Sequence, residues 1–493
     1  MYRMCPFCLK DIEKEEVALK FFSTTTDDFT QWEIYKYCED NPEIDFPMKR
    51  SRDEKYNKFW RLHGVSEERQ SILLNKVKLQ QFIQDLNRED MFNSDGELDY
   101  TYVIPEHNTR ITFKFDSERM RLSMEENGES VFSTIACPEC HNDLPIEFFK
   151  YPQIMIGLLG NKSAGKTTTL CSVLYDNLKA INGSLGILSF EEMQIDSKIA
   201  AMRLDLEKNG IVPAATGMEF IPPVILKVKR FFHESNAPQI YMLCIYDVSG
   251  EALQRFMEMD INQINGIDQL FTPYIKTDGW IFLENPRNTD LYQMNPGEIE
   301  KEKILAQCKV EEGNNQIASQ SVDRPQRFNE LLKNLMKIER LDSTRFINNL
   351  ISIANLEQYG QGVRRGNNQR ISFVLSQADE LKDNLLLKKW KSLFFEQNNI
   401  DYLSDEYRGE RQERKQILEE VFNEYIYDVR RWRGDSFNSV DVYIAAALGS
   451  NPRIEEDEEH KSSYRLQAPY APIRVGEVFV DMVYGIIADR QDE

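Results

Sequence analysis

The sequence contains no long apolar run. None of its 493 residues belongs to a stretch approaching the roughly 18 consecutive apolar residues that a membrane-spanning helix needs. The opening segment MYRMCPFCLKDIEKEE also lacks the apolar core of a secretory signal peptide. We therefore expect a soluble, cytoplasmic protein with no membrane span.

Basic residues are in short supply. The chain has 60 lysines and arginines against 81 aspartates and glutamates, a formal net charge of -21. A chain this acidic repels a phosphate backbone unless a local basic patch overrides the field. Residues 1–150 alone carry 30 acidic against 20 basic side chains. The charge argues against nucleic acid as a partner and favours a protein partner.

Four of the eight cysteines form two Cys-Pro-x-Cys pairs, Cys5 with Cys8 and Cys137 with Cys140. In each pair the proline fixes one backbone angle of a tight turn, and four thiolates are a complete ligand set for a tetrahedral structural Zn²⁺. The pairs begin 132 residues apart, so the site requires an inserted subdomain with adjacent ends. Isolated surface turns are the alternative. We expect His141, directly after Cys140, to lie outside the ligand set.

The segment between the cysteine pairs has mixed patterns. KYNKFWRLHG and SILLNKVKLQQFIQDLNR have apolar residues at helical spacing, whereas LDYTYVIP, RITFKFD and RMRLSME alternate like strands. Residues 1–150 are therefore predicted to form an α+β zinc-ribbon-like domain with an inserted α+β segment.

After residue 150 the pattern changes to short apolar runs separated by longer helical segments. Such an alternation predicts an α/β domain over 151–493, with a mainly parallel sheet covered by helices on both faces. Two charged helical inserts are expected, near 286–370 and 380–438. The predicted strands are Ile154–Leu159, Val224–Val228, Ile240–Tyr246, Trp280–Leu283, Ile371–Leu375 and Val440–Ala447.

The segment GNKSAGKT, residues 160–167, fits the phosphate-loop pattern G-x-x-x-x-G-K-[ST]. It follows the apolar run IMIGLL and opens an apparent helix, which is the required strand–loop–helix setting. Backbone amides of such a loop and the helix N-terminus attract phosphate, the lysine reaches the outer phosphates and the threonine hydroxyl binds Mg²⁺. The predicted nucleotide-binding residues here are Gly160, Asn161, Lys162, Ser163, Ala164, Gly165, Lys166, Thr167 and Thr168.

Three further positions suit the terminal phosphate and its metal. Asp247 ends the apolar segment IYMLCIYD and can hold the Mg²⁺ shell through water. Gly250 can donate its amide to the terminal phosphate, and Glu251 is either a water-positioning residue or a carboxylate at a helix start. Thr216 is either a second hydroxyl ligand to Mg²⁺, on a loop that orders around nucleotide, or an ordinary loop threonine.

The tetrapeptide Ser376-Gln377-Ala378-Asp379 follows the strand ISFVL and is predicted to contact the base. A carboxylate at Asp379 can accept two hydrogen bonds from guanine, whereas adenine offers no such donor pair, so the residue would select GTP. An aspartate before a helix is also a common N-cap, which is the alternative. After the last strand, Ala447 and Leu448 could offer backbone amides to the base oxygen.

The ordered series GNKSAGKT, Thr216, DVSGE, SQAD and AAALG resembles the translation-factor-related (TRAFAC) class of P-loop GTPases. The two cysteine pairs ahead of it resemble the zinc-ribbon-bearing double-GTPase family of bacterial conflict systems. The resemblance implies a P-loop NTPase fold, Thr216 as first switch, Asp247 with Gly250 as second switch, and Asp379 as guanine selector. It also implies a GTPase-activating protein and an effector as partners, and a role in antiviral defence.

The base-contact motif departs from the family pattern, which reads Asn-Lys-x-Asp. Without the asparagine the loop loses a bracing amide, and without the lysine it loses an apolar stem that packs on the base. The resemblance therefore implies GTP selection with weaker affinity for the base.

The leading hypothesis is a GTP-hydrolysing switch that binds GTP and GDP, uses Mg²⁺ and carries a structural Zn²⁺. Its candidate catalytic residues are Lys166, Gly250 and Glu251, which stabilise or position the groups in an in-line attack by water. An arginine could come from Arg364, Arg365 or a partner. The alternatives are an ATP-dependent P-loop signalling enzyme and a non-hydrolytic scaffold that nucleotide only braces.

Overall fold

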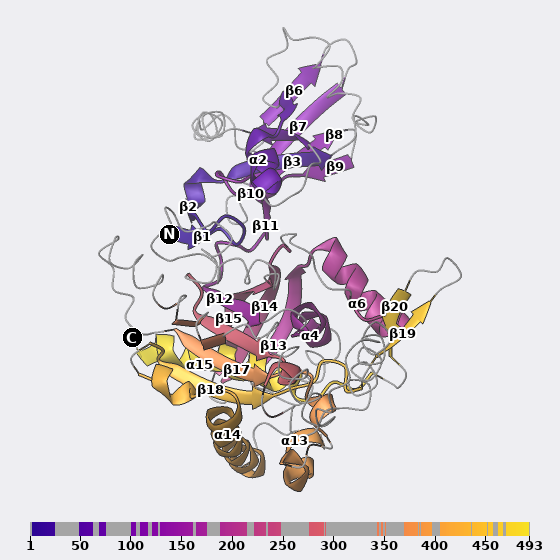
Figure 1. Ribbon diagram of the computed structural model, residues 1–493. Coiled ribbons are helices and arrows are strands. Elements are labelled where there is room, and N and C mark those ends of the chain that lie inside the picture. Colours follow the sequence, from indigo (N-terminus) through magenta and orange to yellow (C-terminus); the bar gives the residue numbers. More distant parts are fainter. Residues whose placement is uncertain are drawn as a thin grey trace. The chain divides into compact units, whose positions relative to one another are not determined.

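The computed structural model separates the chain into two compact units, Met1–Gln153 and Ile154–Glu493 (Figure 1). None of the helices in the described residues is both long and apolar enough to cross a bilayer. The described residues are 2–24, 49–62, 69–74, 100–104, 109–116, 121–126, 129–160, 164–174, 188–213, 221–232, 235–247, 276–289, 291, 343–344, 347–348, 351, 369–382, 384, 386–396, 405–434, 436–450, 452–456, 462–466 and 470–492.

Both cysteine pairs of the first unit lie in turns between short antiparallel strands. The first pair lies between β1 (Tyr2–Met4) and β2 (Asp11–Glu13), and the second between β10 (Thr134–Ala136) and β11 (Asp143–Leu144). Strand β10 also pairs with β3 (Ala18–Thr24), so strands from opposite ends of this unit are direct neighbours. This pairing supplies the adjacent ends that the spacing of the cysteine pairs requires.

The insert between these ends contains α2 and two groups of strands. The predicted helix in KYNKFWRLHG is present as α2 (Glu54–Leu62), and the three alternating segments form a four-stranded antiparallel sheet with a fourth strand, β9. The bounds of this sheet are β6 (Tyr100–Ile104), β7 (Thr109–Asp116), β8 (Arg121–Glu126) and β9 (Glu129–Phe132).

The helix predicted for SILLNKVKLQQFIQDLNR is wrong at its start. Residues Gln70–Leu74 form strand β5, which pairs with β3 on one side and β4 (Lys49–Arg52) on the other. A short apolar run has no decisive periodicity, so its tertiary pairing determines the outcome. Residues 75–99 lie outside the described part of the chain.

The second unit is an α/β fold built on a seven-stranded sheet. All six predicted strands are present, and the strand order is β13-β14-β15-β12-β16-β17-β18. The bounds are β12 (Gln153–Gly160), β13 (Leu188–Gln194), β14 (Val224–Phe232), β15 (Ser235–Asp247), β16 (Gly279–Glu284), β17 (Arg370–Leu375) and β18 (Ser439–Ile444).

The sheet is mixed: it has the expected parallel part and, in addition, an antiparallel part that the sequence analysis did not specify. Strands β12, β16, β17 and β18 are parallel, whereas β14 is antiparallel to both β13 and β15. The reason is connection length: β14 ends at Phe232 and β15 begins at Ser235, and only antiparallel strands can be joined so tightly. Strand β13 was not predicted from the sequence, because its LSFEEMQ segment mixes buried and exposed side chains at the sheet edge.

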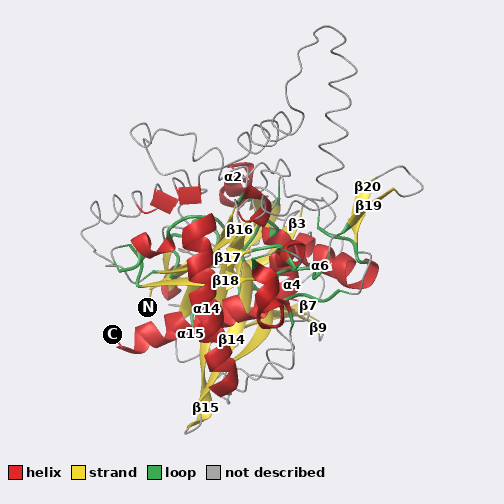
Figure 2. Ribbon diagram, turned by 60° about the horizontal axis from the view of Figure 1, so that its bottom comes forward, coloured by secondary structure: helices red, strands yellow, loops and turns green. Residues whose placement is uncertain are grey.

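Helices cover both faces of this sheet (Figure 2). Alternate side chains of β16 divide between two hydrophobic cores, with Ile281 and Leu283 in one and Trp280 and Phe282 in the other. The first core contains α4 (Lys166–Ser172), α6 (Ser197–Asn209) and α15 (Val475–Asp492); the second contains α13 (Lys391–Phe395), α14 (Asp405–Tyr425) and the 3-10 helix η8 (Val429–Trp432). The insert near 380–438 is thus helical where described, whereas most of 286–370 lies outside the described residues.

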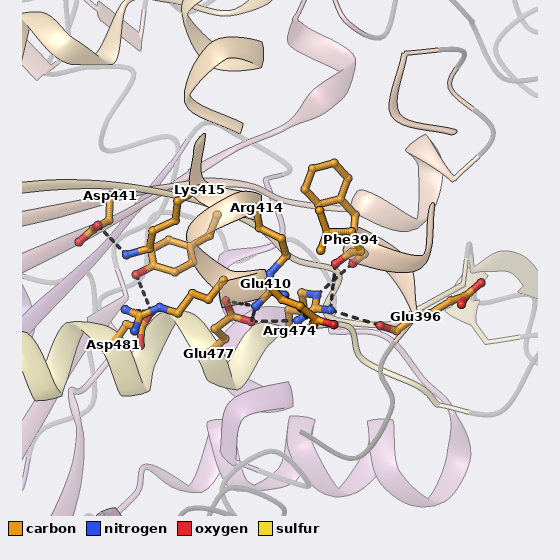
Figure 3. Close-up of polar contacts among 12 residues, drawn as sticks. Phe394, Glu396, Glu410, Arg414, Lys415, Asp441, Arg474, Glu477 and Asp481 are labelled. Atoms are coloured by element: carbon orange, nitrogen blue, oxygen red, sulfur yellow. Dashed lines mark hydrogen bonds and ion pairs between the residues drawn. The ribbon is translucent and has the colours of Figure 1, made fainter. Parts of the chain in front are cut away.

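A buried ionic cluster attaches this insert to α15 (Figure 3). Arg414 of α14 and Arg474 each place a guanidinium nitrogen 3.1 Å from the Glu477 carboxylate. Arg474 also donates to the carbonyl oxygens of Leu393, Phe394 and Glu396 at the end of α13. Burial alone would raise the pKa of Glu477, but the two arginines outweigh it and hold the pKa below its usual value.

A Glu477→Gln variant is expected to lose about 3–5 kcal/mol of unfolding free energy, because two buried guanidinium groups lose the buried carboxylate that they share. Since the pKa of Glu477 is depressed in the folded state, its stabilisation is present above the unfolded pKa of about 4.3 and lost as pH falls through the folded value. The difference from wild type in urea unfolding should therefore shrink below about pH 4. Glu419 of α14 pairs with the exposed Arg430 and Arg433, so Glu419→Gln should cost at most about 1 kcal/mol. Equal stability of wild type and Glu477→Gln would contradict this account.

Candidate nucleotide and metal sites

The carboxyl ends of four parallel strands meet at one edge of the sheet. Gly160 of β12 is in register with Leu283 of β16, and Leu375 of β17 is in register with Glu284 and Ile444 on its two sides. The phosphate-loop segment, the turn after β16, the SQAD tetrapeptide and the loop after β18 therefore all start from this edge. Ligands of open α/β sheets bind at such an edge.

The phosphate-loop segment contains two glycines in unusual backbone conformations. Gly160 has a φ of 149°, and a Cβ there would collide with the carbonyl oxygen of Leu283. Gly165, with a φ of 77°, is the N-cap of α4. Ala164 is buried, and Thr168 belongs to the first turn of α4. Asn161, Lys162 and Ser163 lie outside the described residues.

The side chain of Lys166, near the end of this segment, reaches back to the first residue of the segment. Its Nζ donates to the Gly160 carbonyl oxygen at 2.8 Å, and the residue is buried. Burial lowers the pKa of Lys166 to about 8, and the nearby Asp247 carboxylate opposes the shift. The ammonium group thus lies beside the backbone that would surround a phosphate chain.

Thr167 and Asp247 bring two hard oxygen donors together. Thr167 Oγ1 donates to Asp247 Oδ2 at 2.7 Å, and both residues are buried. Asp247 Oδ1 is buried too and has no hydrogen-bond partner among the described residues. Burial raises the pKa of Asp247 to about 6, although Lys166 and Thr167 counteract the rise. An oxygen donor set with an unsatisfied carboxylate oxygen fits Mg²⁺. Thr216, Gly250 and Glu251 lie outside the described residues.

The SQAD tetrapeptide forms a tight turn directly after β17. Ser376 Oγ donates to the Glu284 carbonyl oxygen at 3.0 Å, and Gln377 has a φ of 51°. Asp379 lies inside the 3-10 helix η6 (Ala378–Leu381), whose N-cap is Gln377, so the N-cap alternative for Asp379 is wrong. Asp379 is half-buried, and burial raises its pKa to about 6.

The loop after β18 is held next to this turn. The Ala378 amide donates to the Ala445 carbonyl oxygen at 3.1 Å, and the Ala471 amide donates to the Leu448 carbonyl oxygen at 3.3 Å. Gly449 has a φ of 77°, and a Cβ there would collide with the backbone of Ala471. Ala447 is half-buried in this loop.

The phosphate-loop segment and the SQAD turn approach each other at this edge. A Cβ built at Gly165 would lie 3.7 Å from Gln377 Nε2. Thr169 of α4, Ser376 and Ala447 also line one small cavity. The two parts of the predicted nucleotide site thus share one place in the fold.

Two contacts made by residues just after the SQAD tetrapeptide were not predicted from the sequence. Arg287 forms a bidentate ion pair with Glu380, and Lys382 Nζ donates to the Gly449 carbonyl oxygen at 3.0 Å. A separation of 93 residues leaves no local pattern that would pair Arg287 with Glu380. The only sequence signal nearby is the Asn-Pro pair at Asn285, which marks the helix start where Arg287 lies.

In the first unit, the four predicted zinc ligands form one cluster. The sulfur atoms of Cys5, Cys8, Cys137 and Cys140 all lie within 4.8 Å of one another. The Cys5–Cys140 and Cys8–Cys137 sulfur separations are 3.7 and 3.6 Å. Zn–S bonds of about 2.3 Å in a tetrahedron require sulfur atoms about 3.8 Å apart. The cluster therefore fits Zn²⁺.

The two cysteine turns have the same backbone hydrogen bonds. The Leu9 amide donates to the Cys5 carbonyl oxygen, and the His141 amide donates to that of Cys137, at 3.0 and 2.9 Å. Leu9 and His141 both have positive φ values, 59° and 52°. The His141 ring places Nδ1 2.6 Å from a carboxylate oxygen of Asp53, as expected for a residue outside the ligand set. Burial raises the pKa of Cys5 well above its usual value, a cost that a bound cation would offset.

Comparison with known proteins gives only distant likenesses. No protein family and no curated protein matches the sequence. Among solved structures, the Saccharomyces cerevisiae Ski7 GTPase-like domain, bound to GTP, is 15% identical with a TM-score of 0.24. That match covers 69% of this chain and 51% of the Ski7 chain, so this chain spans about half the length of that neighbour. A septin GTPase domain from Chlamydomonas reinhardtii is 9% identical with a TM-score of 0.22, covering 69% of this chain and 94% of the septin chain. Likenesses with TM-scores this low carry no argument about function.

Proposed function

We propose that the second unit is a GTP-binding and GTP-hydrolysing switch and that the first unit contains a structural zinc site. The observation that carries the proposal is the convergence of Lys166, the Thr167–Asp247 pair and the Asp379 turn at one edge of the sheet. A phosphate loop, a metal-binding oxygen pair and a base-selecting carboxylate are the three parts that such a switch needs.

The residues of the proposed phosphate site would have separate roles in hydrolysis. Lys166, with its ammonium group at the loop, would exchange its contact with the Gly160 carbonyl for the outer phosphate oxygens. Thr167 and Asp247 would hold Mg²⁺, which supplies charge neutralisation at the outer phosphate oxygens. The predicted roles of Gly250 and Glu251, in donating an amide and orienting water, belong to the same proposal. Arg364 or Arg365, both outside the described residues, or a partner would supply an arginine.

A more specific assignment follows from the order of motifs along the chain. GNKSAGKT, Thr216, DVSGE, SQAD and AAALG follow the order of TRAFAC-class GTPases, and the cysteine pairs precede them as in the zinc-bearing double-GTPase family. We accordingly propose a GTPase-activating protein and an effector as partners and a role in bacterial conflict signalling. Residues 1–150 and 151–493 are the proposed zinc-ribbon-like and GTPase domains.

An Asp379→Asn variant tests the choice of base. Replacing the carboxylate removes the acceptor for both guanine donors, each of which contributes about 1.5–3 kcal/mol when bonded to a charged group. GTP affinity is expected to fall at least about 10-fold, while affinity for xanthosine triphosphate rises, because xanthine presents an oxygen to the new amide. Competition of unlabelled nucleotides against a fluorescent GTP analogue measures both changes. An unchanged order of preference, or faster hydrolysis of ATP than of GTP by wild type, would reverse the base assignment.

A further inference from the structure

The turn that carries Asp379 is fixed to the elements on both sides of it. On one side it contacts the turn after β16 through Arg287 and Glu380. On the other side Lys382 and the Ala378 amide bond to carbonyl oxygens of Gly449 and Ala445, in the segment after β18. The Asp379 carboxylate therefore projects from a short helix held between two neighbouring strand ends.

The Arg287–Glu380 ion pair has the geometry of an orienting contact. Arg287 Nε and Nη2 lie 2.8 and 2.6 Å from the two carboxylate oxygens of Glu380. The Glu380 side chain is only 8% exposed, compared with 39% for that of Arg287. The Asn285 side chain accepts a hydrogen bond from the Arg287 amide at 3.0 Å, which fixes the start of that turn. Two parallel bonds fix an angle as well as a distance, so the pair sets the rotation of η6.

The charged residues around Asp379 also support an orienting role for the Arg287–Glu380 pair. After burial, which raises the pKa of Asp379, its neighbour Glu380 also raises it, whereas Lys382 and Arg287 lower it. Arg287 thus offsets part of the rise that the Glu380 charge causes in the pKa of Asp379. A guanine base needs that group ionised, because the carboxylate must accept two hydrogen bonds.

The ion pair joins Glu380, the residue next to Asp379, to the turn after β16. We propose that Arg287 and Glu380 are positioning residues that orient the Asp379 carboxylate for bidentate recognition of the 2-amino-6-oxopurine edge. The proposal rests on the proposed function and specifies how this chain selects its base.

A matched control pair lies at the start of β17, the strand that precedes the Asp379 turn. Arg370, the first residue of β17, forms a bidentate pair with Asp489 of α15, with nitrogen–oxygen distances of 2.6 and 2.7 Å. This pair and the Arg287–Glu380 pair have similar geometry, but only the latter lies at the carboxyl edge. Asp489→Asn therefore removes a comparable ion pair away from the base.

The test compares affinities of the full-length variants for GTP and inosine triphosphate (ITP), measured by calorimetry. ITP lacks the 2-amino group and offers a carboxylate one donor instead of two, so the ratio of the two affinities reports bidentate recognition. Glu380→Gln is expected to reduce the GTP-to-ITP affinity ratio about 10-fold, as expected for loss of one hydrogen bond to a charged group. Arg287→Lys, which keeps the charge but loses the fork, should reduce the ratio less, and Asp489→Asn should leave it at the wild-type value.

Three outcomes would overturn the inference. Wild-type affinities for both nucleotides in Glu380→Gln and in Arg287→Lys show that the pair does not orient Asp379. An equal loss of affinity for GTP and ITP, which leaves the ratio unchanged, shows a purely structural role. If wild type itself binds GTP no better than ITP and ATP, the guanine assignment in the proposed function fails together with this inference, and that result is distinct from the first two. Arg287→Lys keeps the test decisive if Glu380→Gln does not fold.

Discussion

A Lys166→Ala variant is expected to bind Mg²⁺–GTP at least about 100-fold more weakly than wild type, with hydrolysis reduced to background. Truncating one member of a buried charge pair costs about 2–5 kcal/mol, and 2.7 kcal/mol corresponds to about 100-fold. Lys166 is buried, and its Nζ bonds to the carbonyl oxygen of Gly160 at the start of the phosphate-loop segment. Because the side chain is buried, bulk water would not compensate for the positive charge that the variant loses. Calorimetric titration with Mg²⁺–GTP measures the loss.

The control for this variant is a lysine in an ion pair elsewhere on the same unit. Lys415 of α14 lies 2.7 Å from Asp441, and Lys415→Ala is expected to change stability without changing GTP affinity. Circular dichroism establishes that both variants are folded. Wild-type affinity for GTP in a folded Lys166→Ala protein would show that GNKSAGKT is only a structural turn.

Loss of the cysteine cluster should have an equally large effect, in this case on folding. Replacing Cys137 and Cys140 by serine removes two of four thiolates, and zinc binding by such sites supplies about 10–16 kcal/mol of apparent folding free energy. The double variant is expected to contain no zinc by elemental analysis and to lose protection from hydrogen exchange in strands β1, β2, β10 and β11. Wild type should contain one zinc per chain.

Two buried thiols in the other unit provide the controls for the zinc experiment. Cys171 and Cys244 lie in α4 and β15, apart from the cluster, and Cys171→Ser and Cys244→Ala should each retain the zinc. A wild-type preparation that is folded and free of metal, or a double variant that keeps its zinc, would exclude the proposed metal site.

Much of the fold could be predicted because the information lies in contiguous segments. The strand before GNKSAGKT is an uninterrupted apolar run, and β16, β17 and β18 are mostly apolar because helices cover both of their faces. The sequence did not reveal β13, whose exposed Glu191 and Glu192 pair with Lys229 and Arg203 at the sheet edge. It also did not indicate that β14 runs antiparallel, since direction depends on a two-residue connection rather than on apolar content.

The candidate site, like the fold, has parts that could be predicted from the sequence and parts that could not. Lys166, Thr167 and Asp247 follow from local motifs, and their contacts could be expected once the strands were placed side by side. The Arg287–Glu380 and Arg414–Glu477 pairs could not, because each joins residues more than 60 positions apart whose types are common at any surface. The assignments of Asn161, Lys162, Ser163, Thr216, Gly250 and Glu251 stay predictions from the sequence.

The central claim is that one loop of this chain holds the triphosphate of a magnesium–nucleotide complex. Its most direct test is equilibrium titration of folded, full-length protein with GTP and with ATP, each with and without Mg²⁺. One molecule of GTP is expected to bind per chain, with a clear preference over ATP and weaker binding when Mg²⁺ is removed. Absence of binding to any nucleoside triphosphate would contradict the central claim.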